Sequence, residues 1–191
     1  MSEIKVRPWK GEAYEAPNIF PYKTLILGDS NYTDNPEQFD ENIVIDCVLE
    51  DINDQLDPQG FGKFATKTRR VIFGRDTKIE SEVFWGNVAF YNFVQFLVGN
   101  QARQRPTEEM WANSIPAFEE LISELKPERI LVLGLANWRN LIFHIAHQQK
   151  SEHSAILSVG TNSVLAGYIN HPSSSITYSK WQPIAQALLL Q

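Results

Sequence analysis

The chain is poor in thiols. Cys47 is its single cysteine among 191 residues. One thiol cannot form an internal disulfide, and it supplies too few ligands for an iron–sulfur cluster or a cysteine zinc site. The apolar neighbours Ile43, Val44, Val48 and Ile52 predict that Cys47 is a core residue. We therefore expect no cofactor, no metal and a cytoplasmic location.

Long apolar segments are also missing. No run approaches the roughly 20 residues that a membrane-spanning helix needs, and the first ten residues are too polar for a secretory signal. With 43% hydrophobic and 21% charged side chains, the composition is that of a globular chain that can bury a core. We therefore expect no contact with a membrane, one domain over residues 1–191 with 1–20 as an N-terminal extension, and a monomer.

Positive charge is in deficit. The 17 Lys and Arg residues against 23 Asp and Glu residues give a formal net charge of −6. Binding nucleic acid by bulk electrostatics relies on Lys and Arg, so this balance argues against that mode. The cations are nevertheless clustered, at Lys63, Lys67, Arg69, Arg70, Arg75, Lys78, Arg103 and Arg105. They could line a local basic cleft backed by the acids of 34–57 and 108–128, or belong to a mixed solvated surface.

Short apolar runs alternate with segments of helical periodicity. This pattern is typical of a parallel α/β sheet with helices on its faces. It predicts strands at 23–27, 88–91, 129–133 and 165–170, and helices at 39–56, 61–73, 107–125, 135–148 and 176–190. Residues 155–159 fit either a short strand or a loop. The expected fold class is α/β, with a central, mainly parallel four-stranded sheet in a three-layer α/β/α sandwich.

Unusual polar residues follow three of the predicted strands. Gly28-Asp29-Ser30-Asn31-Tyr32 comes after the first strand, Asn92 after the second, and His171-Pro172-Ser173-Ser174-Ser175 after the last. In open parallel sheets, ligands bind outside the carboxyl ends of the strands. We therefore expect the three segments to meet in one cleft.

The last of these segments combines an imidazole with three hydroxyl groups. His171 can stabilise a developing anion or move a proton. Pro172 fixes φ locally, and the serine hydroxyls and backbone amides can bind phosphate. Taken alone, the segment is as well explained as a polar turn with an incidental histidine. The polar residues after the other strands favour the functional interpretation.

In this order, across about residues 23–181, the motifs resemble those of the uracil-DNA glycosylase superfamily. Residues 28–32 are similar to its first motif, and residues 130–134 to its third strand. Asn92 stands where the family has the asparagine that reads uracil, and Trp111 where it often has a tryptophan. Residues 171–175 are similar to the final motif. The resemblance implies a uracil-DNA glycosylase-like fold, and DNA containing a damaged base as the partner, in single or double strands.

The resemblance also implies a role for each residue. In hydrolysis of the N-glycosidic bond of uracil or another damaged base, His171 would stabilise the leaving anion and Asp29 would orient water. Asn92 would donate to and accept from the base edge. Tyr32 and either Phe90 or Phe93 would pack on an extruded base. The residues implied to contact the nucleic-acid backbone are Ser30, Ser173, Ser174 and Ser175.

Two departures from the family pattern keep other interpretations open. The best-studied branch has its water-activating carboxylate where this chain has Ser30, so Asp29 would act instead, as in the iron–sulfur branch, whose cysteines are missing here. Ser174 and Ser175 replace a proline and a bulky apolar wedge, although Ile176 could be a displaced wedge. The alternatives are a catalytically inactive member of the fold that binds a nucleobase, nucleic acid or protein, and an unrelated small-molecule hydrolase.

Overall fold

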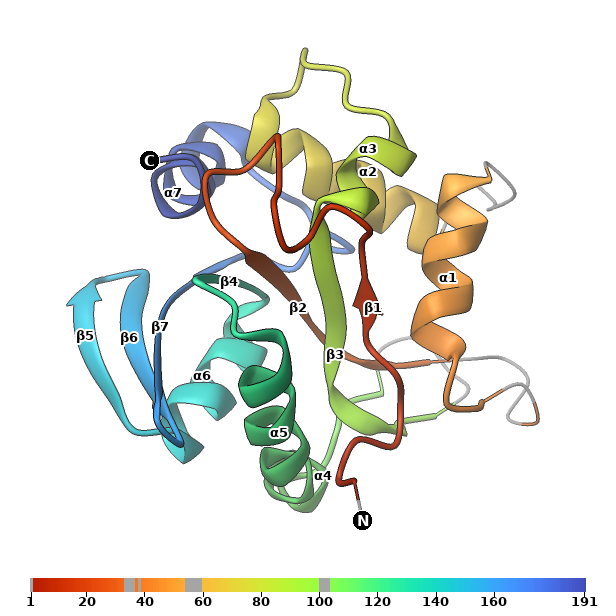
Figure 1. Ribbon diagram of the computed structural model, residues 1–191, viewed down its shortest axis with the longest axis vertical. Coiled ribbons are helices and arrows are strands. Elements are labelled where there is room, and N and C mark those ends of the chain that lie inside the picture. The colour runs from red at the N-terminus through yellow and green to blue at the C-terminus, as the bar shows by residue number, and fades with distance from the viewer. Residues whose placement is uncertain (1, 33–36, 38, 54–59, 100–103) are drawn as a thin grey trace.

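A single mixed sheet organises the chain in the computed structural model, which describes residues 2–32, 37, 39–53, 60–99 and 104–191. The spatial strand order in this sheet is β1-β3-β2-β4-β7-β6-β5 (Figure 1). The strands are β1 (Trp9–Lys10), β2 (Thr24–Asn31), β3 (Val88–Leu97), β4 (Arg129–Leu133), β5 (His147–Ser151), β6 (Ser154–Val159) and β7 (Asn162–Ile169). The helices are α1 (Ile43–Ile52), α2 (Gly60–Phe73), α3 (Ser81–Gly86), α4 (Glu108–Asn113), α5 (Ile115–Leu125), α6 (Leu135–His144) and α7 (Tyr178–Leu189).

The four predicted strands form the parallel centre of the sheet. Strands β3, β2, β4 and β7 are neighbours in this order and pair in parallel. All residues of β2 and nearly all of β4 are buried. Strands covered on both faces read as continuous apolar runs, which is why the sequence revealed them. The α/β class is therefore confirmed.

The prediction of a four-stranded sheet is wrong, because three antiparallel strands extend the sheet to seven strands. β1 has only two residues, too few to show a periodicity. Every residue of β5 is exposed and its sequence is polar, so its apolar signal is missing. The hairpin of β5 and β6 also shortens the helix predicted at 135–148, since α6 ends at His144.

Two other predicted helices differ from the observed ones. The helix expected at 107–125 divides at Ser114 into α4 and α5, and Pro116 lies in the first turn of α5, where a proline is tolerated. The helix expected at 39–56 is observed as α1, and the end of that prediction lies outside the described residues. The short helix α3 had no sequence signal.

Helices flank the sheet in two groups (Figure 1). α2 packs against α7, and α7 contacts β4 and β7. α6 contacts the same two strands, and α4 contacts β3. In Figure 1, α2, α3 and α7 gather in the upper part of the view, while α4, α5 and α6 gather in the lower part. Because these helices cover the faces of the central strands, polar side chains of the strands can meet only near the strand ends.

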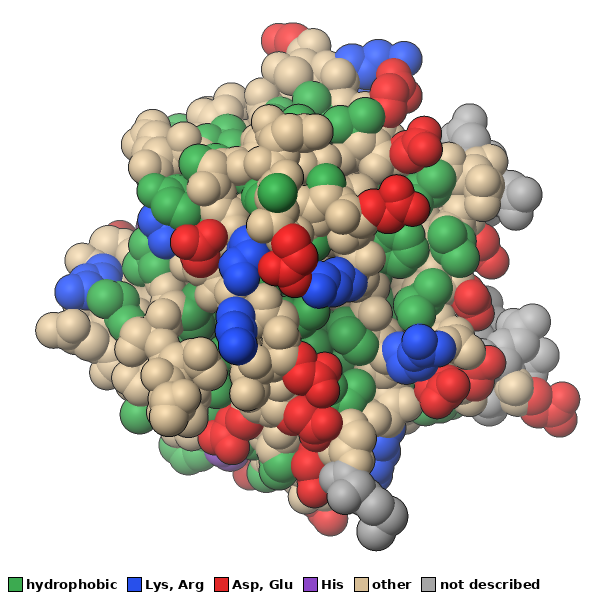
Figure 2. All heavy atoms as spheres, in the orientation of Figure 1, with side chains coloured by type: hydrophobic (Ala, Val, Ile, Leu, Met, Phe, Trp, Pro, Cys, Tyr) green, Lys and Arg blue, Asp and Glu red, His purple; other side chains and the backbone are tan. Residues whose placement is uncertain are grey.

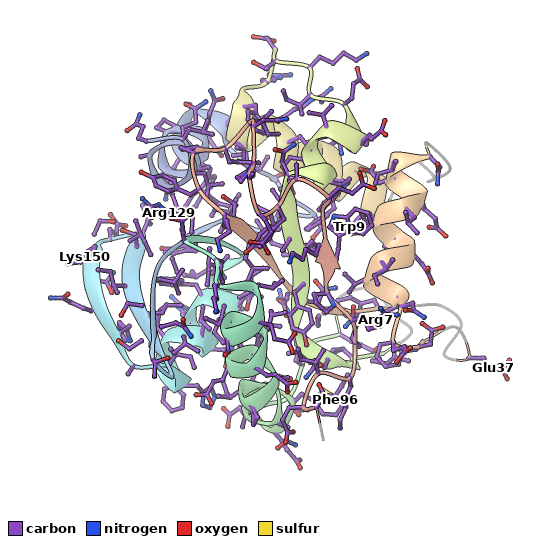
Figure 3. All side chains as sticks on the ribbon, viewed as in Figure 1. Arg7, Trp9, Glu37, Phe96, Arg129 and Lys150 are labelled. Carbon is purple, nitrogen blue, oxygen red and sulfur yellow. The ribbon has the colours of Figure 1, made fainter. Side chains whose placement is uncertain are left out.

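The N-terminal residues pack on the sheet. β1 pairs with β3, and Trp9 Nε1 donates to the carbonyl of Trp85 at 2.8 Å (Figure 3). Tyr14 is fully buried, and its hydroxyl donates to the carbonyl of Leu125 at 3.2 Å. Cys47 is only partly buried, yet burial raises the pKa of its thiol to about 11. It is therefore a thiol with little reactivity near neutral pH.

The surface is polar at one sheet edge and mixed in charge. Lys150 on edge strand β5 projects away from the molecule (Figure 3), a feature that discourages pairing with other strands. On the face shown in Figure 2, acidic and basic side chains are interspersed rather than separated. In the described part of the chain, no helix is both long and apolar enough to cross a membrane.

Candidate functional site

The central strands are paired in register where the sequence predicted their ends, but two of them run further than predicted. β2 continues through Asp29 to Asn31, and β3 continues through Asn92 to Leu97, so these polar residues lie within strands. Leu27 of β2 is opposite Val132 of β4, which is opposite Tyr168 of β7. Gly28 is opposite Asn92 of β3. Asp29, Asn92 and the loop that follows β7 therefore come together at one edge of the sheet, as expected for parallel strands.

Asn92 is held by close contact with β2. Its Nδ2 donates to Asn31 Oδ1 at 2.8 Å, and Asn31 Nδ2 donates to the carbonyl of Val94 at 3.1 Å. A Cβ atom at Gly28 would overlap Asn92 Oδ1, so the glycine makes room for the amide. The Asn92 side chain is thus fixed, with Oδ1 and the second N–H of Nδ2 left for a ligand.

Asp29 is nearly buried at this edge, with an exposed fraction of 8%. Its Oδ1 has no hydrogen-bond partner of good geometry within the described residues. Arg105 Nη1 lies 3.9 Å from Asp29 Oδ2. Burial raises the pKa of the Asp29 carboxyl, and the Arg105 cation opposes this rise. The charge of Asp29 therefore depends on two opposing effects: burial favours the neutral carboxyl, and Arg105 favours the carboxylate.

His171 is fixed by its own loop. The backbone N–H of Ser173 donates to His171 Nδ1 at 3.3 Å, and Ser173 Oγ lies 2.6 Å from the same atom. Burial, together with the charges of Arg105 and Lys67, lowers the pKa of His171 to about 4. The imidazole is therefore neutral near pH 7, and because Nδ1 accepts, its proton is on Nε2.

Lys67 on α2 holds the His171 loop from the other side. Its Nζ donates to the carbonyls of Pro172 and Ser174, both at 2.8 Å. Gly134, at the start of α6, lies against the imidazole, because a Cβ built there would be 3.4 Å from His171 Cβ. The loop is thus contacted by Lys67 of α2 on one side and by Gly134, between β4 and α6, on the other.

The serines lie differently from the expectation. Ser30 is buried, and Ser30 Oγ has no partner in the described part of the chain, so it is not available to a nucleic-acid backbone. Ser173 Oγ faces His171 Nδ1, and Ser174 Oγ donates to the His171 carbonyl at 2.7 Å. Both hydroxyls stabilise the loop, and Ser175 is exposed. A serine hydroxyl that bonds within its own loop in this way is less available to bind a ligand.

The aromatic residues also depart from the expectation. Phe90 and Phe93 have exposed fractions of 1% and 0%, because β3 is covered on both faces, so neither lies at the surface. Phe64 of α2 is the ring beside the site, with its centroid 5.5 Å from that of His171 and 6.0 Å from that of Phe90. Trp111 packs on Phe93 in the core, at 5.3 Å between centroids.

Tyr32 is the site aromatic that reaches solvent. Its exposed fraction is 43%, and its hydroxyl donates to the carbonyl of Gln104 at 2.9 Å. It therefore ties the end of β2 to the segment that carries Arg105.

Sequence reasoning missed four supporting residues. Lys67 and Arg105 were visible only as members of cation clusters, and Phe64 was only a member of the helix predicted at 61–73. Asn137 of α6 is buried, and its Nδ2 donates to the carbonyls of Leu27 and Gly28 at 3.2 and 2.8 Å. It stabilises the end of β2, but an asparagine inside a helix gives no sequence signal for this role.

Other parts of the molecule offer less chemistry. A cavity of about 320 Å³ lies between α7, β7 and the β5–β6 hairpin, and its lining residues are mainly apolar. In the described residues, no three His, Cys, Asp or Glu side chains gather in a way that could hold a metal ion. No protein-family model matches the chain, and no curated protein matches it significantly.

Proposed function

We propose that the protein is a divergent, monofunctional DNA glycosylase-like hydrolase on a uracil-DNA glycosylase-like α/β/α fold. Its substrate would be DNA that contains uracil or another damaged base. One observation carries the proposal: a carboxylate, Asp29 of β2, an amide, Asn92 of β3, and a neutral imidazole, His171 just after β7, lie at the same end of neighbouring parallel strands. Fixed polar groups of three such types match the needs of N-glycosidic bond hydrolysis.

The reaction breaks the bond between the anomeric carbon and the base nitrogen. The base leaves with both bonding electrons, and the oxygen of a water molecule bonds to the anomeric carbon. Asp29 accepts a proton of this water, and the departing base later takes a proton from solvent. Negative charge develops on a carbonyl oxygen of the base, where the Nε2–H of His171 can stabilise it without losing its proton.

Base selection rests on Asn92. The remaining N–H and the Oδ1 of its amide give one donor and one acceptor, which complement a base edge that presents a carbonyl beside an N–H. Cytosine presents a different pattern of donors and acceptors on the same edge. The hydrogen bond to Asn31 stops the amide from rotating to suit both bases.

The burial of Asp29 favours a second candidate function. Burial raises the pKa of this carboxyl and so favours its protonated form, and a protonated carboxyl cannot accept a proton from water. Ser30, the neighbouring residue, is a weak base. The second candidate is therefore a catalytically inactive protein of the same fold that binds a nucleobase, nucleic acid or a protein.

Incubation with labelled oligonucleotides distinguishes the two functions. Single- and double-stranded substrates with one uracil are treated with the protein and then with alkali, beside Asp29→Ala, His171→Ala and, as a control on the exposed edge strand, Lys150→Ala. Strand breaks with the parent and Lys150→Ala, and strong loss in the other two variants, support the glycosylase. No breaks across a panel of damaged bases at high protein concentration would overturn it in favour of the binding protein.

A further inference from the structure

Arg105 lies beside Asp29, and its charge also bears on His171. Its Nη1 lies 3.9 Å from Asp29 Oδ2, and Asp29 has no other ion pair among the residues that the structure describes. Its charge also acts on the His171 imidazole, together with that of Lys67. The cation that shifts the pKa of Asp29 is Arg105, not Lys67. Arg105 is thus the cation common to both groups.

The backbone next to Arg105 is anchored to the site. The Tyr32 hydroxyl donates to the carbonyl of Gln104 at 2.9 Å, directly before Arg105 in the chain. The side chain of Gln104 in turn lies against Gly99, where a Cβ would overlap it. The Arg105 side chain itself is 73% exposed, so this backbone contact, rather than burial, places Arg105 next to Asp29.

We propose that Arg105 is a positioning residue, anchored through Tyr32, whose guanidinium keeps Asp29 charged and His171 neutral at the same time. A cation attracts a carboxylate and repels an imidazolium, so one charge supports both states that the chemistry needs. Its effect on catalysis rests on the proposed hydrolysis, whereas its effect on the two charges does not. Solvent screens an exposed guanidinium, so the effect is modest rather than decisive.

Few charged or titratable groups of the described part of the chain face the pair. Asp29 is faced by Arg105 and by the hydroxyl-bearing side chains of Ser30 and Tyr32. His171 is faced by Arg105 and Lys67. Burial acts on both groups and is unchanged when Arg105 is replaced. Substitution of Arg105 therefore isolates the contribution of its charge.

The first test is an NMR titration of the Asp29 carboxyl carbon and the His171 ring in the substrate-free protein. Arg105→Gln is expected to raise the pKa of both groups. Lys67→Met is the matched control, expected to raise the pKa of His171 alone, and Arg75→Gln, in the turn that follows α2, is expected to change neither. An unchanged Asp29 titration in Arg105→Gln would overturn the proposal.

The second test is the pH profile of strand cleavage. With Arg105→Gln, the acidic limb of kcat is expected to move to higher pH while the plateau is retained, and Arg105→Lys is expected to restore most of the parent profile. Tyr32→Phe, which removes the anchor, is expected to shift the limb in the same direction but less. A uniform loss at every pH would contradict the role of charge. If no substrate is cleaved, the proposed function fails, and the NMR titration still decides the role of Arg105.

Discussion

The backbone amide of Ser173 donates to Nδ1 of His171, two residues earlier in the same loop. This bond is incompatible with a proton on Nδ1, so the neutral ring must carry its proton on Nε2. The tautomer is thereby set within the loop, where the Ser173 hydroxyl also lies 2.6 Å from Nδ1 and can donate to it. A ring held in this way can donate to an anion without being charged, and the loop gives the histidine its chemical role.

Stability should depend on pH through His171. The pKa of His171 is lowered to about 4 in the folded protein, against about 6.5 for an unfolded histidine. The unfolded chain therefore binds more protons between these values, and the free energy of unfolding should fall as pH drops from about 6.5 to 4, by up to about 3 kcal/mol. Urea denaturation over this range in the parent and in His171→Gln measures the effect.

The comparison between these two proteins isolates the histidine. Asp29 contributes with the opposite sign, because its pKa is raised in the folded state and protonation on acidification favours folding. This contribution is common to both proteins and cancels in their difference. If the difference in unfolding free energy does not change with pH, the imidazole is not held neutral by the fold.

Replacement of Gly28 should disturb base recognition. In Gly28→Ala, the new Cβ would overlap Asn92 Oδ1, so the amide must move and its bond to Asn31 is strained. We expect a loss of roughly 1–3 kcal/mol in unfolding free energy, as for other overpacked sites, and a lower ratio of cleavage at uracil to cleavage at cytosine. Gly86→Ala is the control, because a Cβ there meets no atom within 4 Å. Equal behaviour of the two variants would contradict the close fit at Gly28.

The sequence could predict the strand ends because of how parallel strands are buried. β4 and the first half of β2 are covered on both faces and read as apolar runs, so the polar residues after the run in β2 stand out, although β2 itself continues to Asn31. Alignment of the ends is then a property of any parallel sheet. The location of Asp29, Asn92 and His171 could be inferred without a structure for this reason.

The edge strands and the supporting contacts could not be predicted in this way. β5 is exposed along its whole length, so burial imposes no pattern on its sequence. Arg105 and Lys67 act through the positions of their charges in space, and their partners are distant in the sequence. The burial of Phe90 depends on which helices cover β3. Each of these features is set by tertiary packing rather than by local preference.

Asp51 should be one of the most sensitive buried positions away from the site. Its Oδ2 accepts from Arg69 Nη1 and from Trp85 Nε1, both at 2.7 Å, and so joins α1, α2 and α3. Asp51→Ala would leave a nearly buried guanidinium and an indole N–H without this acceptor. We expect a loss of about 3–5 kcal/mol in unfolding free energy, measured by urea denaturation. Glu50→Ala on the exposed face of α1 should cost far less, and similar losses in both variants would argue against the buried pair.

Asp29→Asn should separate catalysis from binding. The amide has nearly the same shape as the carboxyl but cannot accept a proton from water, so single-turnover cleavage should fall by about 10²–10⁴-fold. Affinity for an uncleaved oligonucleotide with a uracil should be retained or increased, because a negative charge near the DNA is removed. Fluorescence anisotropy gives this affinity on the same samples. A variant that cleaves as fast as the parent would exclude Asp29 as the base. If the parent does not cleave and both proteins bind uracil-containing DNA, the site is one that recognises a base without hydrolysing its bond.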